Sequence, residues 1–173
     1  MNILAIDAST RSSGWAYFQE NDLIDYGCLK ASSTDMINRI EKIINELNSV
    51  LQQHPVDKIV LEEVRPEEKN SQGFSNIKTY KALMYLQAAI NFLIHHKYNS
   101  IEIIYKYPSE WRKECGIHTG RGIKREILKQ ESIDFAKSNY SLQENINDDI
   151  ADAIGLGHSE VKSNFIKNEL NWE

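Results

Sequence analysis

The sequence is poor in cysteine and proline, with two and three residues respectively, and it contains no long apolar run. Two distant cysteines, Cys28 and Cys115, exclude a disulfide framework and argue against a zinc site, and they are typical of a reducing compartment. No stretch reaches the roughly 20 apolar residues that a membrane helix needs. The first residues also lack the basic and apolar regions of a signal peptide. We therefore expect a cytoplasmic protein with no membrane partner.

Basic charge is also scarce, because 25 acidic residues oppose 20 basic ones and give a net charge of −5. Taken alone, this balance disfavours a nucleic-acid-binding protein, since phosphate contacts need Lys and Arg. The 41% of hydrophobic and 26% of charged residues are ordinary for a globular chain and disfavour disorder. A length of 173 residues predicts a single domain over 1–173, with the last roughly ten residues as a possible tail.

Hydrophobic patterning predicts alternating strands and helices. Short buried runs favour strands, and apolar residues at spacings of three and four favour amphipathic helices. The pattern predicts strands at about 2–7, 14–18, 23–30, 58–62 and 100–105, and helices at about 34–53, 77–96, 123–138 and from Asn147 onward. A helix between two buried strands favours a parallel pair. The fold class is therefore α/β, with a mixed five-stranded sheet flanked by helices.

Acidic residues end two of the predicted strands. Asp7 closes the first strand, and Glu62 closes the strand at 58–62. Carboxyl ends of parallel neighbours lie side by side, so these acids share one edge of the sheet. Asp149 and Asp152 are three residues apart on the last predicted helix and project from one of its faces. Small residues around them allow this helix to approach the sheet: Ala151, Ala153, Gly155 and Gly157.

A cluster of four carboxylates needs a cation, because like charges at short range repel by several kcal/mol. Oxygen-only ligands favour Mg²⁺ or Mn²⁺ over zinc. Two such ions about 4 Å apart activate a water and stabilise the leaving oxygen of a phosphodiester, which is nuclease chemistry.

Each acid also has a structural explanation. Asp7 could form a turn. Glu62 and Glu63 are adjacent, so only one of them faces the site, and strand alternation alone does not say which. Asp148, Asp149 and Asp152 could stabilise a helix N-terminus through its dipole.

Three segments together resemble a known family. Ile6-Asp7-Ala8-Ser9-Thr10 with Gly14, then Val60-Leu61-Glu62-Glu63-Val64, then Asp149-Ile150-Ala151-Asp152-Ala153, are similar to motifs of the RuvC-like Holliday junction resolvases, particularly the phage-type members. The resemblance covers about residues 1–160. It implies a ribonuclease H-like fold, a homodimer, and Mg²⁺-dependent nicking of two strands of a four-way DNA junction. By this resemblance, the catalytic acids and metal ligands are Asp7, Glu62, Asp149 and Asp152, with two ions per site and Mn²⁺ as a substitute.

The chain departs from the bacterial members of this family in two places. Many of those carry an aromatic residue shortly after the strand glutamate, whereas this chain has Arg65-Pro66, with Phe74 as the next aromatic. The glycine and lysine spacing of Thr119–Arg125 is also shorter. Base stacking at the junction and sequence preference at the cleavage site therefore stay open.

A basic segment lies between residues 105 and 130. It holds seven basic and three acidic residues, a local charge of +4 that leaves −9 for the rest of the chain. Glycine-rich loops and helix starts attract phosphate through backbone N–H groups. The alternative for Lys113 and Lys129 is an ordinary solvated helix face, and Trp111 is expected to anchor the core. We expect DNA contacts from Arg65, Lys113, His118, Arg121, Lys124 and Arg125.

The predicted helix at 77–96 is apolar on more than one face, since it carries Tyr80, Met84, Tyr85 and Phe92 beyond its core set. This excess and the resemblance both predict dimerisation through this helix. The expected function is a structure-selective endonuclease, a crossover junction endodeoxyribonuclease that resolves four-way junctions. Three alternatives remain: a ribonuclease H-like nuclease for RNA–DNA hybrids or flaps, a sugar-kinase or actin-like ATPase domain, and an inactive junction-binding protein.

Overall fold

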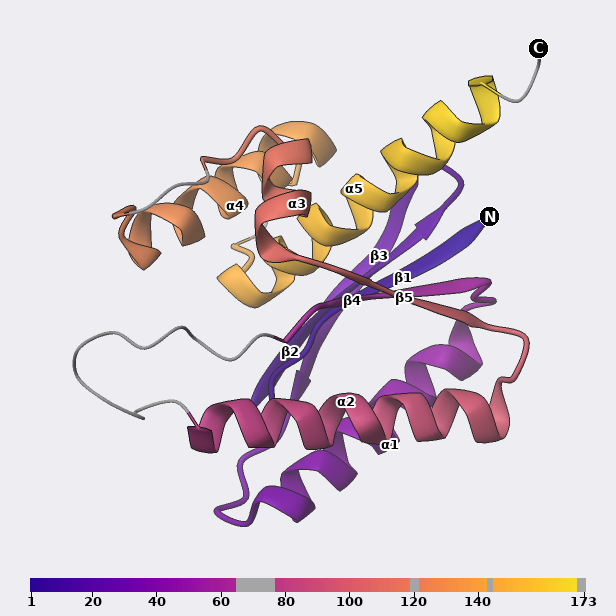
Figure 1. Cartoon of the computed structure of the whole chain (residues 1–173), viewed down its shortest axis with the longest axis vertical. Coiled ribbons are helices and arrows are strands. Elements are labelled where there is room, and N and C mark those ends of the chain that lie inside the picture. Colours follow the sequence, from indigo (N-terminus) through magenta and orange to yellow (C-terminus); the bar gives the residue numbers. More distant parts are fainter. Residues whose placement is uncertain (65–76, 119–121, 143–144, 171–173) are drawn as a thin grey trace.

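A computed structural model describes residues 1–64, 77–118, 122–142 and 145–170, with side chains up to Ser163. Its strands form one mixed five-stranded sheet in the order β3-β2-β1-β4-β5 (Figure 1). β1 is antiparallel to β2 and parallel to β4, and β4 is parallel to β5. This confirms the predicted sheet. The strands are β1 (Asn2–Asp7), β2 (Ser12–Gln19), β3 (Asp22–Lys30), β4 (Lys58–Glu62) and β5 (Glu102–Lys106).

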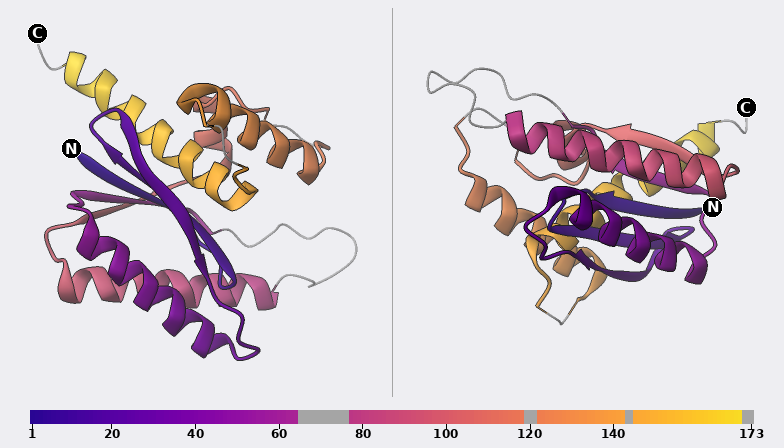
Figure 2. Two further views of the ribbon diagram at one scale, coloured as in Figure 1. Left: turned by 180° about the vertical axis from the view of Figure 1, so that it is seen from behind. Right: turned by 90° about the horizontal axis from the view of Figure 1, so that it is seen from below.

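Helices cover both faces of the sheet (Figure 2). On one face lie α1 (Met36–Gln53) and α2 (Ile77–Lys97), which pack on Leu4, Ile6 and Leu61. On the other face lie α4 (Arg125–Tyr140) and α5 (Asp148–Leu170), which pack on Ala5 and Val60. Strand alternation therefore divides the core into two layers, one on each side of the sheet.

The predicted helix boundaries are confirmed to within a few residues, and one helix was missed. Asp35 caps α1 by accepting the N–H of Asn38, and α1 ends directly before His54 and Pro55. The missed helix is α3 (Pro108–Glu114), in a segment for which no helix was expected. Proline suits the first position of a helix, and Glu110 accepts the N–H of Tyr107 at 3.0 Å.

Small residues bring α5 close to the sheet, as expected. Ala151 and Ala153 are fully buried. A Cβ placed on Gly157 would lie 2.2 Å from the Phe18 ring, and a Cβ on Gly14 would lie 1.8 Å from the carbonyl oxygen of Asp149. The first turn of α5 therefore rests directly on the backbone of β2, and the helix continues to Leu170.

Further along, buried ion pairs hold α5 to the sheet. The Glu160 carboxylate lies 3.0 Å from the Lys58 ammonium and 3.4 Å from that of Lys106. Burial of Glu160 is possible because two cations neutralise it. Within the described part of the chain, no helix has the length and apolarity to cross a bilayer.

Candidate active site

The site is built on the ends of two central strands. Ile6 of β1 pairs with Leu61 of β4 in parallel register, so the next residues, Asp7 and Glu62, come side by side. Alternation places Asp7 on the same face as Ala5, and Glu62 on the same face as Val60, which is the face that α5 covers. As expected from the sequence, the two strand acids meet beneath the last helix, α5.

The first two turns of α5 bring the other two acids to this point. Burial raises the pKa of Asp7 well above its ordinary value, and the charges of Glu62, Asp152 and Asp149 raise it further. A neighbouring carboxylate has this effect only at short range, since the interaction falls with distance. The four acids named from the sequence therefore form one electrostatic cluster.

The structure also separates these acids from their neighbours. Glu63 continues the pairing of β4 with β5, because its backbone N–H donates to the carbonyl of Lys106 at 2.8 Å. Asp148 forms an ion pair with Lys129, and this partner lowers the pKa of Asp148 despite its partial burial. Asp149 instead accepts the Ser12 hydroxyl at 2.5 Å. The charges that raise the pKa of Asp7 are those of Glu62, Asp152 and Asp149, whereas the charge of Asp148 acts on Asp152.

Helix α3 supplies two partners that the sequence analysis did not identify. The indole N–H of Trp111 donates to Oε2 of Glu62 at 2.9 Å, and Nη2 of Arg112 lies 3.4 Å from Oδ2 of Asp152. Burial raises the pKa of Glu62, and the Trp111 bond and the Arg112 charge oppose that rise. The pattern Pro108-Ser109-Glu110 ahead of Trp111 was the available signal, since it is typical of a helix start.

Arg112 is a cation that pairs directly with one of the four acids. Its guanidinium stacks over the Trp111 ring at 4.7 Å and interacts with Asp152. Burial raises the pKa of Asp152, and the Ser132 hydroxyl and the Arg112 charge oppose that rise. Oδ1 of Asp152 and the Ser132 hydroxyl are nevertheless both buried without a well-formed hydrogen bond. A single guanidinium therefore neutralises only part of the cluster's charge.

The donor chemistry fits a hard divalent cation. All four side chains offer only carboxylate oxygens, their charges repel, and one buried oxygen lacks a well-formed hydrogen bond. Among the residues that the structure describes, no three His, Cys, Asp or Glu side chains are arranged to hold a metal ion as they stand. Their oxygens instead meet Ser12, Trp111 and Arg112. Mg²⁺ suits such a place because it takes few protein carboxylates and completes its shell with water and phosphate.

The structure describes four of the six residues from which DNA contacts were expected. Lys124 is the N-cap of α4 and Arg125 its first residue, and both are exposed. The charge of Arg125 lowers the pKa of Glu62 and of Asp148, so it acts on the acids from the start of α4. Lys113 is exposed on α3. The imidazole of His118 lies 2.6 Å from the Glu131 carboxylate. Arg65 and Arg121, like the aromatic Phe74, lie outside the described residues.

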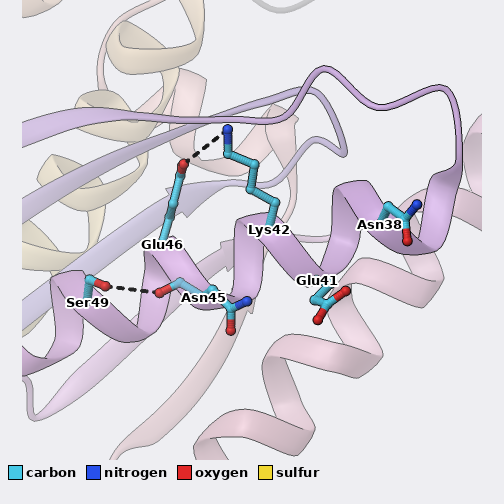
Figure 3. A pocket seen from close by; sticks show the side chains of 6 residues that line it. All are labelled: Asn38, Glu41, Lys42, Asn45, Glu46 and Ser49. Atoms are coloured by element: carbon cyan, nitrogen blue, oxygen red, sulfur yellow. Dashed lines mark hydrogen bonds and ion pairs between the residues drawn. The ribbon is translucent and has the colours of Figure 1, made fainter.

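A shallow pocket occurs on the outer, polar side of α1, away from the acids (Figure 3). All of its lining residues belong to this one helix: Asn38, Glu41, Lys42, Asn45, Glu46 and Ser49. Lys42 pairs with Glu46 at 3.8 Å, and the Ser49 hydroxyl donates to the carbonyl of Asn45. These are ordinary contacts within a helix surface, so the pocket is not part of the candidate site.

Similar sequences occur in a protein family and among curated proteins. The sequence model of a family described as Lactococcus phage M3 protein matches residues 1–158. Crossover junction endodeoxyribonucleases RuvC from two strains of Ehrlichia ruminantium, Gardel and Welgevonden, are each 36% identical over 72 residues. That match spans 37% of this chain and 45% of the length of these relatives.

Solved structures share the fold over almost the whole chain. Thermus thermophilus RuvC in complex with a Holliday junction substrate has a TM-score of 0.73 at 13% identity, covering 95% of this chain and 96% of that one. The yeast mitochondrial Holliday junction resolvase Ydc2 has a TM-score of 0.55 at 16% identity, covering 96% and 83%. At these identities the matches show a shared fold, in agreement with the predicted mixed five-stranded sheet, and the curated relatives add a sequence similarity to RuvC over part of the chain. Because the family model spans residues 1–158, the chain belongs to the Lactococcus phage M3 protein family.

Proposed function

We propose that this protein is a metal-dependent, structure-selective DNA endonuclease that resolves four-way junctions by paired phosphodiester hydrolysis. The observation that supports this most is the acid cluster at the ends of β1 and β4, where burial and then the charges of Glu62, Asp152 and Asp149 raise the pKa of Asp7. Such a concentration of like charge is costly unless a cation neutralises it, and a bound cation can in turn bind a phosphate substrate. The names of the curated relatives, crossover junction endodeoxyribonuclease, agree with that chemistry.

In this proposal, the cofactor is Mg²⁺, for which Mn²⁺ substitutes, with two ions held by Asp7, Glu62, Asp149 and Asp152. When bound, such ions supply an activated water and stabilise the leaving oxygen of a phosphodiester. The protein's own part is to orient the carboxylates. Ser12 holds Asp149 through its hydroxyl, and Arg112 offsets charge beside Asp152.

Branched DNA is the proposed partner, and the start of α4 is the proposed phosphate-binding surface. Lys124 and Arg125 are exposed where the helix dipole and free N–H groups also favour anions. Lys113 and His118 lie on the segment that leads to α4. With Arg65 and Arg121, these residues make the proposed DNA contacts, and the cytoplasm is the proposed compartment.

A homodimer is proposed because paired nicks in a junction with approximate two-fold symmetry call for two sites related by a two-fold axis. Helix α2 offers the surface. Met84, Tyr85 and Phe92 are 40%, 53% and 71% exposed, on the side of the helix that faces away from Leu86 and Ile90. Exposed apolar stripes of this kind mark protein interfaces.

The activity can be tested with labelled four-way junction, linear duplex, flap and RNA–DNA hybrid, each in Mg²⁺ or in EDTA. We expect symmetric nicking of the junction in Mg²⁺ alone. Equal or preferred cutting of the hybrid or the flap would instead identify a different ribonuclease H-like nuclease. ATP turnover without cutting would identify an ATPase domain.

Neighbouring acids provide matched controls for the assigned residues. Asp7→Asn, Glu62→Gln and Asp149→Asn should each lower the cutting rate at least about 100-fold, because each removes a carboxylate that the proposed ions need. Junction binding in EDTA should persist. Glu63→Gln and Asp148→Asn change the adjacent charge and should retain cutting. If the two sets behaved alike, the assignment of the acids would be wrong.

A further inference from the structure

We propose that Trp111 is a positioning residue that orients the Glu62 carboxylate for the cation and sets the spacing between β4 and α5. The inference rests on the proposed function, in which Glu62 is a metal ligand. It adds a residue that neither the acidic motifs nor the charge pattern identify.

The first support is a hydrogen bond between distant parts of the chain. The Trp111 side chain is fully buried, and its indole N–H donates to Oε2 of Glu62 at 2.9 Å. A buried indole N–H needs an acceptor, and a carboxylate gives it a stronger bond than a neutral oxygen does. The bond engages Oε2 of Glu62 and so restricts the rotation of the carboxylate. An otherwise rotatable side chain is thereby held in one orientation.

The second support is the packing of the Trp111 ring against α5. A Cβ placed on Gly155 would lie 2.6 Å from Cζ3 of Trp111, so the ring lies against the helix backbone. Gly155 follows Asp152 by less than one helical turn. One side chain therefore bonds to an acid on β4 and contacts the turn next to an acid on α5.

The third support is Arg112, which is linked to the same ring. Its guanidinium lies over the Trp111 ring at 4.7 Å and interacts with Asp152. The ring thus also supports the cation that partly neutralises the cluster. Groups that orient metal ligands by hydrogen bonding commonly contribute 10- to 100-fold to metal affinity or activity, as general experience with such partners indicates.

A purely structural role is the competing explanation, because any buried tryptophan stabilises a core. The variant Trp111→Phe distinguishes the two roles, since it keeps an aromatic ring and removes the N–H donor. Trp15→Phe is the matched control. Trp15 is also buried, but it packs in the layer of α1 and α2, on the face of the sheet opposite α5.

The measurement is Mn²⁺ binding to the full-length protein without DNA, by calorimetry, together with the Mg²⁺ concentration that gives half-maximal junction cutting. We expect Trp111→Phe to weaken Mn²⁺ binding about 10-fold and to raise the half-maximal Mg²⁺ concentration by a similar factor. Its cutting rate should recover largely at saturating Mg²⁺. Trp15→Phe should change neither quantity, even if it lowers the thermal stability.

A second measurement follows the indole N–H resonances by NMR, in the wild-type protein and in the two variants that assign the Trp111 signal. The chain has three tryptophans, so its indole N–H resonances are few. Loss of one resonance in Trp111→Phe, or its shift in Glu62→Gln, assigns Trp111. We expect Mg²⁺ to shift this resonance in the wild type and not in Glu62→Gln.

The outcomes separate the inference from the proposed function. Suppose that the wild-type protein binds Mn²⁺ and cuts junctions. An unchanged Mn²⁺ affinity in Trp111→Phe, or an indole resonance that does not shift with Mg²⁺, would then overturn the positioning role of Trp111. The proposed function would still stand. Wild-type protein that neither binds Mn²⁺ nor cuts would overturn both.

Discussion

Asp7 is the acid on which the charges of the other three carboxylates act together. Burial and three neighbouring carboxylates raise its pKa well above the ordinary value. The folded chain therefore keeps a proton on Asp7 at pH values where the unfolded chain has released it. Because the folded state then binds more protons, the free energy of unfolding of the metal-free protein falls as pH rises from about 4 through the raised pKa.

We predict that Asp7→Asn stabilises the protein in EDTA at pH 8 and much less at pH 5. The amide removes a charge that repels its neighbours, and the wild-type carboxyl carries less of that charge at the lower pH because its pKa is raised. An increase of roughly 2–4 °C in melting temperature at pH 8 corresponds to about 1 kcal/mol for a chain of this size. Thermal unfolding at the two pH values measures the difference.

Asp148→Asn serves as the control with the opposite sign. The ion pair with Lys129 lowers the pKa of Asp148, so its charged form stabilises the fold above the unfolded pKa. Removing that charge should lower the melting temperature at pH 8. A decrease for Asp7→Asn as well would show that repulsion around Asp7 is not the dominant effect.

Among the elements, α5 must pack closely on the sheet for the four acids to come together. Its first turn touches β2 at Gly14, its middle touches Trp111 at Gly155, and Gly157 meets Phe18. Buried charges at Glu160 hold its later turns. Each of these contacts fixes the helix that carries Asp149 and Asp152 against the strands that carry Asp7 and Glu62.

Gly14→Ala tests this contact directly. The added Cβ would lie 1.8 Å from the carbonyl oxygen of Asp149, and a backbone atom cannot yield as a flexible side chain does. We predict a loss of about 2–3 kcal/mol in the free energy of unfolding, in line with other overpacked cores, and a reduced cutting rate. Chemical denaturation and the junction assay measure the two effects.

Gly116→Ala is a suitable comparison for Gly14→Ala. Gly116 has a φ of +73° but no atom within 4 Å of an added Cβ. It should therefore lose only about 1 kcal/mol, from backbone strain, and retain cutting. Equal losses in the two variants would mean that the approach of α5 to β2 is not tight.

The elements that could be predicted are those with a strong local pattern. The apolar spacing over 34–53 and 77–96 identified α1 and α2, and the acids that end two apolar runs identified the strand ends of the site. Helix α3 was missed because its seven residues include only one buried apolar side chain, Trp111. A single apolar residue has no periodicity to detect.

Long-range contacts account for the rest of what the sequence could not predict. Ile59, Val60 and Leu61 are all apolar, so alternation within β4 gave no choice between Glu62 and Glu63 until both faces of the sheet were known. The bond from Trp111 to Glu62 joins residues 49 positions apart. Such a pairing depends on how α3 packs on the sheet, and no local rule contains that information.

At the scale of the whole molecule, the net charge of −5 is the sum of an acidic region and a basic region. The acids gather around Asp7, whereas Lys124 and Arg125 begin α4 close enough for the Arg125 charge to act on Glu62. A polyanion is attracted to the basic helix start, and only a bound cation makes the adjacent acids tolerable to it. The overall acidity therefore does not exclude DNA as a partner.

The exposed side of α2 leads to the last prediction, which concerns assembly. Phe92 is 71% exposed and stacks on His96, in a stripe with Met84 and Tyr85. We predict that the wild-type protein is a dimer by size-exclusion chromatography with light scattering at micromolar concentration. Phe92→Glu should be monomeric, since it places a charge in an apolar interface.

Ile37→Glu is the matched control for Phe92→Glu, because Ile37 is an exposed apolar residue, 60% exposed, on α1 rather than α2. It should remain dimeric. A monomeric Phe92→Glu protein should still nick one strand of a junction but lose the coordination of the two cuts, since each protomer keeps its own acids. A dimer that persists in Phe92→Glu would place the two-fold axis elsewhere, and a wild-type monomer would require two independent encounters with each junction.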